Sequence, residues 1–296
     1  MSACSLLDAW DMKLKKTSHK LKVLGDSHMS MVTLIISLSL LQGSACGQSG
    51  APEDAVADSS YRVLLRAEVQ TAPDKKTGLP QFGSDKFEVK RKAMVTQQIE
   101  KRGVKDQRVL HALRRVPRHE FVPASERSIA YEDYPLPIGH GQTISQPYIV
   151  GFMTELLQLK PGDTVLEVGT GSSYQAAILA EIVKEVVSIE IIDALAKSAA
   201  KRLERLGYKN ITVASGDGYF GWKERATFDA IIVTAAADHI PPPLLRQLKV
   251  GGRMAIPVGR TGWTQNLLLV EKQEGGKFIT RNILAVRFVA LTREKR

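Results

Sequence analysis

Short apolar runs alternate with amphipathic stretches through the second half of the chain. Four runs are typical of buried strands, and helical patterns such as Asp193–Leu206 lie between them: 164–168, 185–189, 211–214 and 228–234. Strands at Gln265–Glu271 and Ile283–Leu291 complete the predicted sheet. Strands that alternate with helices form parallel sheets covered on both faces. The pattern therefore predicts an α/β fold with a doubly wound, mostly parallel sheet.

The stretch before this sheet has a different pattern. Apolar residues from Met94 to Leu113 recur at helical spacing and are interrupted at Gly103, which predicts a small N-terminal cap of two helices. Tyr131–Val150 is polar and rich in proline and glycine, and a loop of this length is usually functional. We expect a leader and linker at 1–85, a helical cap with a substrate loop at 86–150, and a ligand-binding domain at 151–296.

The leader contains a segment similar to a secretory signal. Several lysines precede the apolar run Met31–Leu41, and small residues at Gly43–Cys46 resemble a cleavage site. The run is short for a transmembrane helix, so no stable membrane insertion is expected. The alternative is a start codon placed too far upstream of a cytoplasmic protein, with Met94 or another internal methionine nearer the true start. Ala51–Asp85 has the composition of a linker.

Composition excludes some chemistry from the folded part. The 296 residues are 44% hydrophobic and 24% charged, which suits a globular domain. The net charge of +10 is scattered along the chain, so we expect no nucleic-acid partner. Cys4 and Cys46 both lie in the leader, which leaves no predicted disulfide, thiolate nucleophile or cysteine metal site. The histidines lack ligand spacing, and we expect structural or surface roles and no bound metal.

One stretch, Thr164–Ala177 (TVLEVGTGSSYQAA), predicts a strand, a tight turn and a helix. Gly169 and Gly171 let the backbone pass close to a ligand, which then meets free N–H groups at the start of the helix. A G-x-G turn alone is weak evidence. Glu190 strengthens it, because an acid about twenty residues after the glycines can accept ribose hydroxyls.

The acidic residue before the glycines bears on which ligand binds. Glu167 would repel the pyrophosphate of NAD, whereas the cationic S-adenosylmethionine tolerates a carboxylate. Tyr174 also occupies the third glycine position of the dinucleotide fingerprint. We therefore favour S-adenosylmethionine, with an NAD-dependent oxidoreductase as the alternative.

Longer motifs make the resemblance specific. AYEDYPLPIGHGQTISQPYIV followed by VLEVGTGSSYQAAILAEIV resembles the protein-L-isoaspartate (D-aspartate) O-methyltransferase family, and RVPRHEFVP is similar to the stretch that precedes them there. The likeness runs from about Lys90 to Leu291. It implies a Rossmann-like class I methyltransferase that transfers a methyl group from S-adenosylmethionine to the free carboxylate of L-isoaspartyl residues in damaged proteins, which starts their repair. D-aspartyl residues are a second candidate acceptor. A carboxylate with a pKa of about 4 needs no strong general base.

The resemblance also implies roles for particular residues. Ser145 corresponds to the active-site hydroxyl; its alternative role is to cap a helix at Pro147. The residues assigned to the cofactor are Glu167, Gly169, Gly171, Glu190, Asp217 and Gly218, of which Asp217 and Gly218 resemble an adenine-binding pair. The residues assigned to the substrate are Thr143, Ile144, Val286 and Phe288. Glu167 has the alternative roles of supporting the glycine loop or capping the strand end.

Two positions depart from the family pattern. Ser173 replaces a third glycine, so the turn needs either a left-handed serine or a shifted path, which would weaken cofactor binding. Ala290 replaces a proline in VRFVPL, a stretch whose backbone helps to hold the substrate. Two further alternatives therefore remain: a methyltransferase acting on RNA or a small molecule, and a binding homologue with weakened catalysis. We expect a monomer in the cytoplasm, where S-adenosylmethionine is made, and an exported or periplasmic enzyme is the rival.

Overall fold

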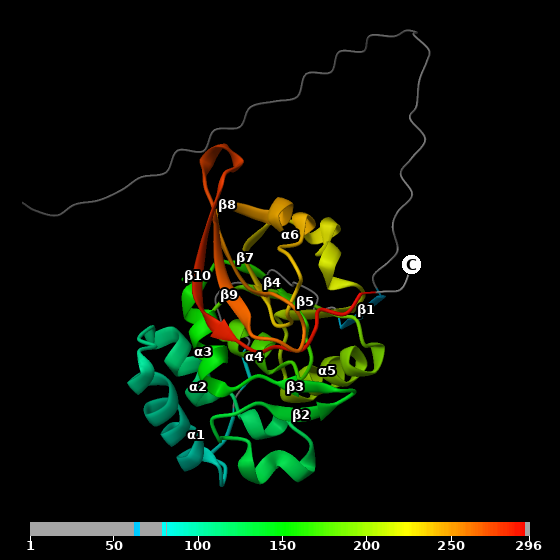
Figure 1. Cartoon of the computed structure of the whole chain (residues 1–296). Helices are drawn as coiled ribbons and strands as arrows, with labels where there is room; N and C mark the ends of the chain where they lie inside the picture. The colour runs from blue at the N-terminus through cyan, green and yellow to red at the C-terminus, as the bar shows by residue number, and fades with distance from the viewer. Residues whose placement is uncertain (1–61, 66–78, 81, 294–296) are drawn as a thin grey trace, which may run out of the picture. The chain divides into compact units, whose positions relative to one another are not determined.

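The computed structural model describes residues 62–65, 79–80 and 82–293 (Figure 1). The predicted signal-like segment Met31–Cys46, both cysteines and most of the predicted linker Ala51–Asp85 lie outside these residues. The linker prediction was wrong at Arg62–Leu65, which form a strand at the edge of the central sheet. In the described ranges, no helix combines the length and the apolar character needed to cross a bilayer.

A central eight-stranded sheet has the order β1-β6-β5-β4-β7-β8-β9-β10 (Figure 1). The strands are β1 (Arg62–Leu65), β4 (Thr164–Val168), β5 (Glu185–Glu190), β6 (Ile211–Ser215), β7 (Phe228–Val233), β8 (Leu248–Val258), β9 (Gln265–Lys272) and β10 (Phe278–Val286). Strands β6, β5, β4, β7 and β8 are parallel, whereas β1, β9 and β10 pair antiparallel with their neighbours. The inner strands are apolar runs because both of their faces are buried. The predicted mostly parallel, Rossmann-like sheet is confirmed.

Helices α4 (Tyr174–Ala180), α5 (Asp193–Leu206) and α6 (Pro242–Gln247) connect these strands. The chain proceeds from β4 outward to β5 and β6, and then returns to β7 on the other side of β4. This reversal opens a crevice at the carboxyl ends of β4 and β7, the place where such sheets bind ligands.

The predicted helical cap is present. It contains α1 (Glu88–Met94), a π-helical and a 3₁₀ turn at 95–102, α2 (Gln107–Arg115), and 3₁₀ turns at Arg118–Phe121 and Ala124–Ile129. Gly103 ends the first helical stretch with φ of 103°, which confirms the predicted break. The Asp106 side chain then caps α2 by accepting a hydrogen bond from the Arg108 N–H.

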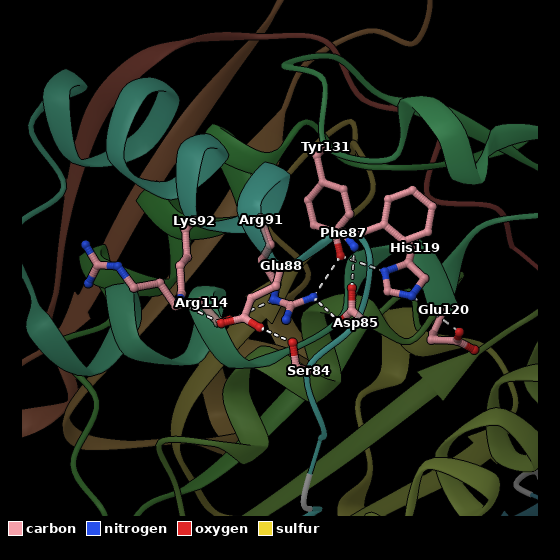
Figure 2. A network of polar contacts seen from close by, with 10 residues as sticks. All are labelled: Ser84, Asp85, Phe87, Glu88, Arg91, Lys92, Arg114, His119, Glu120 and Tyr131. Carbon is pink, nitrogen blue, oxygen red and sulfur yellow. Dashed lines mark hydrogen bonds and ion pairs between the residues drawn. The ribbon is translucent and has the colours of Figure 1, made fainter.

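Buried polar contacts hold the base of the cap (Figure 2). Arg91 Nη1 donates to Asp85 Oδ2 at 2.8 Å and to the Tyr131 hydroxyl at 3.2 Å, and that hydroxyl lies 2.7 Å from His119 Nδ1. The Phe87 ring packs 4.4 Å from the His119 ring, centroid to centroid. Burial lowers the pKa of His119, which favours the neutral ring. His119 therefore contributes to the packing and hydrogen bonding of the cap.

The segment predicted as a loop, Tyr131–Val150, contains regular structure. Strands β2 (Leu136–Gly139) and β3 (Gln142–Ile144) form a hairpin, and α3 (Pro147–Leu156) begins shortly after it. The loop prediction was wrong here because proline and glycine hide the alternation of two very short strands. The three turn residues 139–141 have positive φ, which explains the glycines. The predicted division at residue 150 falls inside α3.

The last strand also differs from its predicted range. It covers Phe278–Val286 rather than Ile283–Leu291, because its first half is an exposed edge paired with β9 and carries no apolar pattern. The chain then leaves the sheet and bonds to the loop after β7. The Ala236 N–H donates to the Val289 carbonyl and the Leu291 N–H donates to the Ala236 carbonyl, both at 2.8 Å. Phe288 and Leu291 are partly buried against the core, which accounts for the apolar character that suggested a longer strand.

Candidate active site

A cleft lies at the carboxyl ends of β4, β5 and β7. The glycine turn after β4, the end of β5, the hairpin and the C-terminal segment supply its walls, which include Gln142–Ser145, Val168–Ser172, Ile189–Ile192, Gly218, Thr234, Ala235 and Val289–Thr292. Of the residues assigned to the cofactor, Gly169, Gly171, Glu190 and Gly218 line this cleft.

The glycine turn is packed too closely for a side chain at its first position. A Cβ on Gly169 would lie 2.5 Å from Thr234 Oγ1, and the residue has φ of 98°. Its N–H donates to the Ile189 carbonyl at 2.8 Å, which fixes the turn to the end of β5. Residues 169–172 of the turn line the cleft, so the backbone there, bare of a side chain at Gly169 and Gly171, can approach a ligand closely.

Glu190 holds the other wall of the cleft. Its side chain accepts hydrogen bonds from the Gly171 N–H at 2.8 Å and the Ile192 N–H at 2.9 Å. Burial raises the pKa of this carboxyl group. Each carboxylate oxygen can accept more than one hydrogen bond, so the group retains capacity for ligand hydroxyls.

Ser173 has the left-handed backbone that the missing glycine predicted, with φ of 63° and ψ of 11°. The residue is fully buried, and its hydroxyl donates to the Ser172 carbonyl at 2.5 Å. The turn therefore keeps its path with serine, and the alternative of a shifted path is not needed.

Glu167 lies behind the glycine turn and not on the surface of the cleft. It is fully buried, its Oε2 hydrogen-bonds with the Ser188 hydroxyl, and its Oε1 has no partner among the described residues. The Thr170 hydroxyl, from the turn, lies 2.6 Å from Ser188 Oγ. Burial raises the pKa of Glu167 to about 8. This position corresponds to the role of supporting the loop.

Asp217 likewise does not line the cleft, although Gly218 does. Its carboxylate accepts the Tyr219 N–H at 3.0 Å and pairs with Arg293 Nε at 2.8 Å. The Arg293 guanidinium also lies 3.5 Å from the centre of the Tyr219 ring. The end of the described chain is therefore attached to the turn beside the cleft.

A wider groove of about 660 Å³ adjoins the cleft between the hairpin and the antiparallel end of the sheet. Its walls include Pro135, Gln146, Ile149, Thr261, Gly262, Thr264 and Ala285–Val289. Three residues assigned to the substrate, Thr143, Val286 and Phe288, line this groove. The fourth, Ile144, is buried and lines the cleft instead.

Four residues line both the cleft and the groove, and we call them the junction residues: Thr143, Ser145, Thr234 and Val289. The hydroxyl of Ser145 has no hydrogen-bond partner among the described residues. Helix α3 has Gln146 at its N-cap and Pro147 at its first position, so the alternative role of Ser145 as its cap is not observed.

Thr234 and Val289 were not identified from the sequence. The Thr234 hydroxyl donates to the Gly169 carbonyl at 2.6 Å, so its hydrogen is already engaged. Thr234 directly follows β7, at the carboxyl edge of a parallel sheet where ligands bind, and this position could have identified it as a site residue from the sequence. Val289 lies inside VRFVAL, the stretch that resembles the substrate-holding VRFVPL, but its place between the two cavities depends on the path of the chain after β10. Within the part of the chain that the structure describes, no group of three or more His, Cys, Asp or Glu residues could hold a metal ion.

Comparison with known proteins identifies the family of the chain. The sequence model of the family described as protein-L-isoaspartate(D-aspartate) O-methyltransferase (PCMT) matches residues 89–296. A protein-L-isoaspartate O-methyltransferase 2 of Syntrophobacter fumaroxidans is 67% identical over 63% of this chain and 76% of its own length. A protein-L-isoaspartate O-methyltransferase 1 of Cupriavidus necator is 61% identical over 63% of this chain and 72% of its own length.

Solved structures show the same likeness. A protein-L-isoaspartate O-methyltransferase with a TM-score of 0.62 is 31% identical, and the match covers 67% of this chain and 65% of that one. A Plasmodium falciparum beta-aspartate methyltransferase, solved with S-adenosyl-L-homocysteine, has a TM-score of 0.60 and 26% identity over 69% of this chain and 99% of its own. The chain belongs to the protein-L-isoaspartate (D-aspartate) O-methyltransferase family.

Proposed function

We propose that the reaction of this family takes place at the junction residues, with S-adenosylmethionine in the cleft and the damaged protein segment in the groove. The reaction transfers a methyl group from S-adenosylmethionine to the free carboxylate of an L-isoaspartyl residue. The observation that carries the proposal is that Ser145 lies where the two cavities meet. A donor in one and an acceptor in the other can come within bonding distance only there.

The cleft fits the cofactor. Gly169 leaves a bare backbone where a Cβ would clash, and Glu190 presents a buried carboxylate that can accept ribose hydroxyls. Gly218 lies at the wall where the adenine would bind, with Asp217 behind it and Glu167 behind the glycine turn. When bound, S-adenosylmethionine supplies an electrophilic methyl group on a positively charged sulfur.

Ser145 orients the acceptor. The isoaspartyl carboxylate is ionised at neutral pH, so the site needs no base to activate it. A neutral hydroxyl can donate one hydrogen bond to a carboxylate oxygen and leave the other oxygen free to attack. A lysine in this place would hold the carboxylate as an ion pair and lower its nucleophilicity. Opposite charges are lost together in the transition state, so a water-poor site favours the transfer.

The groove holds the peptide on either side of the reacting residue. Val286 and Phe288 form an apolar wall, while Thr143 is exposed on the opposite hairpin. The Phe288 N–H is already bonded to Gln265 Oε1 at 2.9 Å, which fixes this wall. Ile144 lies on the cleft side and keeps water away from the transferring methyl group.

Ser145→Ala tests the role of the hydroxyl. Loss of one hydrogen bond to a charged group costs about 1.5–3 kcal/mol, so kcat/KM should fall roughly 10- to 150-fold. Affinity for S-adenosylhomocysteine should stay within about twofold. The assay follows labelled methyl transfer to an isoaspartyl peptide and to the same peptide with normal aspartate, with Ser128→Ala as the control. Undiminished transfer by the Ser145 variant would remove Ser145 from the reaction, and absence of label in the wild type would exclude this acceptor.

We further infer that the chain acts as a monomer on proteins, without nucleic acid, and in the cytoplasm. The cytosolic supply of S-adenosylmethionine supports this location, and the signal-like segment supports the rival, an exported or periplasmic enzyme. Fractionation with mass measurement of the mature chain separates the two, and light scattering gives the oligomeric state. A processed form outside the inner membrane would contradict the proposed location.

A further inference from the structure

Arg118 is a fully buried cation next to the junction residues. It belongs to the 3₁₀ turn Arg118–Phe121 of the cap, and none of its surface is exposed. Its Nε donates to the Ala130 carbonyl and its Nη2 donates to the Ser145 carbonyl, both at 2.8 Å. These two carbonyl groups belong to the residues on either side of 131–144, the segment that contains the β2–β3 hairpin. The planar guanidinium of Arg118 therefore links the two residues that flank this segment, Ala130 and Ser145.

The same group also contacts the cofactor side. The guanidinium carbon of Arg118 lies 4.9 Å from the centre of the Tyr174 ring. Tyr174 is the first residue of α4 and lines the cleft. Arg118 thus connects the carbonyl of the proposed acceptor-binding residue with an aromatic wall of the cofactor cleft.

Burial of this charge is costly for the fold. Burial lowers the pKa of Arg118 to about 10, so the group still carries its charge at neutral pH. Two of its donors bond to carbonyl oxygens and its guanidinium lies over the Tyr174 ring, while Tyr174, Tyr131 and Asp133 partly offset the cost of burial. Replacement of buried ionic groups by apolar side chains of similar volume is often neutral or stabilising, so stability alone does not account for Arg118. Its geometry, by contrast, supplies something that an apolar residue cannot, namely two donors held at a fixed angle.

We propose that Arg118 is a positioning residue for methyl transfer, which fixes Ser145 by joining the two ends of the 131–144 segment. The inference rests on the proposed function of Ser145. Ser145 follows directly on β3 and precedes the N-cap of α3, so its carbonyl is the point at which the hairpin is joined to the cap. Release of that carbonyl would let the hydroxyl move relative to the cleft. A misplacement of about 1 Å can lower a rate roughly 100-fold.

Arg91 provides a matched control in the same cap. It is also buried, and its Nε donates to a backbone carbonyl, that of Arg114, at 2.8 Å. Its remaining bonds go to Asp85 and to the hydroxyl of Tyr131, the first residue of the 131–144 segment, and none goes to a junction residue or to the far end of that segment (Figure 2). Arg118→Lys and Arg91→Lys therefore each replace a buried guanidinium, which donates several hydrogen bonds, by a single ammonium group. Only Arg118→Lys removes the hydrogen bond to the Ser145 carbonyl.

The test compares these two variants, and Arg118→Gln with Arg91→Gln as a second pair, at a temperature where thermal unfolding shows all to be folded. We expect the Arg118 variants to lose roughly 10- to 100-fold in kcat toward an isoaspartyl peptide, with the Kd for S-adenosylhomocysteine within about twofold. The Arg91 variants should keep kcat within about twofold. Equal losses of kcat in both pairs would overturn the proposal, because they would indicate a general weakening of the cap.

Hydrogen exchange gives a readout that does not depend on activity. Amide exchange across β2 and β3 should be roughly tenfold faster in Arg118→Lys than in Arg91→Lys. If the wild type fails to methylate the isoaspartyl peptide, the proposed function fails, and this exchange still decides whether Arg118 fixes the segment. Equal exchange in the two variants would refute the role of Arg118.

Discussion

Ser173 allows the cost of a left-handed residue in the cofactor turn to be measured directly. The residue has φ of 63°, is fully buried and donates its hydroxyl to the Ser172 carbonyl. Ser173→Ala loses the hydroxyl bond, worth about 0.5–1.5 kcal/mol, and keeps the left-handed Cβ. Ser173→Gly loses the same bond but also removes a backbone cost of about 1–2 kcal/mol. Part of this gain is offset, because glycine makes the unfolded chain more flexible by about 0.5–1 kcal/mol.

The glycine variant should therefore exceed the alanine variant in free energy of unfolding by about 1 kcal/mol and lie near the wild type. Urea unfolding followed by circular dichroism measures this difference, and each kcal/mol corresponds to roughly 2–4 °C in Tm for a domain of this size. Both variants keep the N–H groups of the turn, so we expect the Kd for S-adenosylhomocysteine to change less than the stability. An alanine variant as stable as the glycine variant would refute the reasoning, because it would show that residue 173 carries no left-handed cost.

Two further predictions concern Glu167 and Ala290. The pKa of Glu167 is raised from 4.5 to about 8, so the folded state keeps a proton that the unfolded state releases between these values. The contribution of Glu167 to the free energy of unfolding should therefore be fully present below pH 4.5 and fall toward pH 8 by at most about 1.4 kcal/mol per pH unit. In urea titrations at pH 5 and pH 8, Glu167→Gln should reduce the loss of stability between these two pH values, and an unchanged difference would contradict the prediction. The bonds to Ala236 use the Val289 carbonyl and the Leu291 N–H, so Ala290→Pro breaks neither. It should stabilise the chain by about 0.4–1 kcal/mol in the same assay with unchanged methyl transfer, and a loss above about 1 kcal/mol would contradict it.

The sequence predicted well those elements whose pattern is local. Asp193–Leu206 has the predicted bounds, because an apolar stripe identifies it and Gly207 ends it in a left-handed conformation. The parallel strands were recognisable because both of their faces are buried. The hairpin 136–144 was missed because its strands are only a few residues long and include proline and glycine. Its local sequence pattern is too short to predict it, and its conformation depends on the rest of the fold.

The candidate site was predictable where a motif marks it. Gly169, Gly171 and Glu190 lie in the cleft because their spacing follows from the geometry of a strand, a turn and the next strand. Glu167 and Asp217 lie behind the residues that line the cleft. Only the packing of the folded chain separates positions that line the cleft from positions behind it. The role of Arg118 depends on contacts 12 and 27 residues away along the chain, which no spacing rule predicts.

The cleft and the groove have few residues in common, and this has a consequence for engineering. The groove is formed largely by the loop containing Thr261 and Thr264 and by Ala285–Phe288, none of which lines the cleft. Libraries directed at these positions can therefore be screened for altered preference among damaged peptides without rebuilding the donor side. Selection for a modified methyl donor, in contrast, would act on the glycine turn. Among the residues that line the two cavities, only the junction residues belong to both, so a change there would affect donor and peptide preference together.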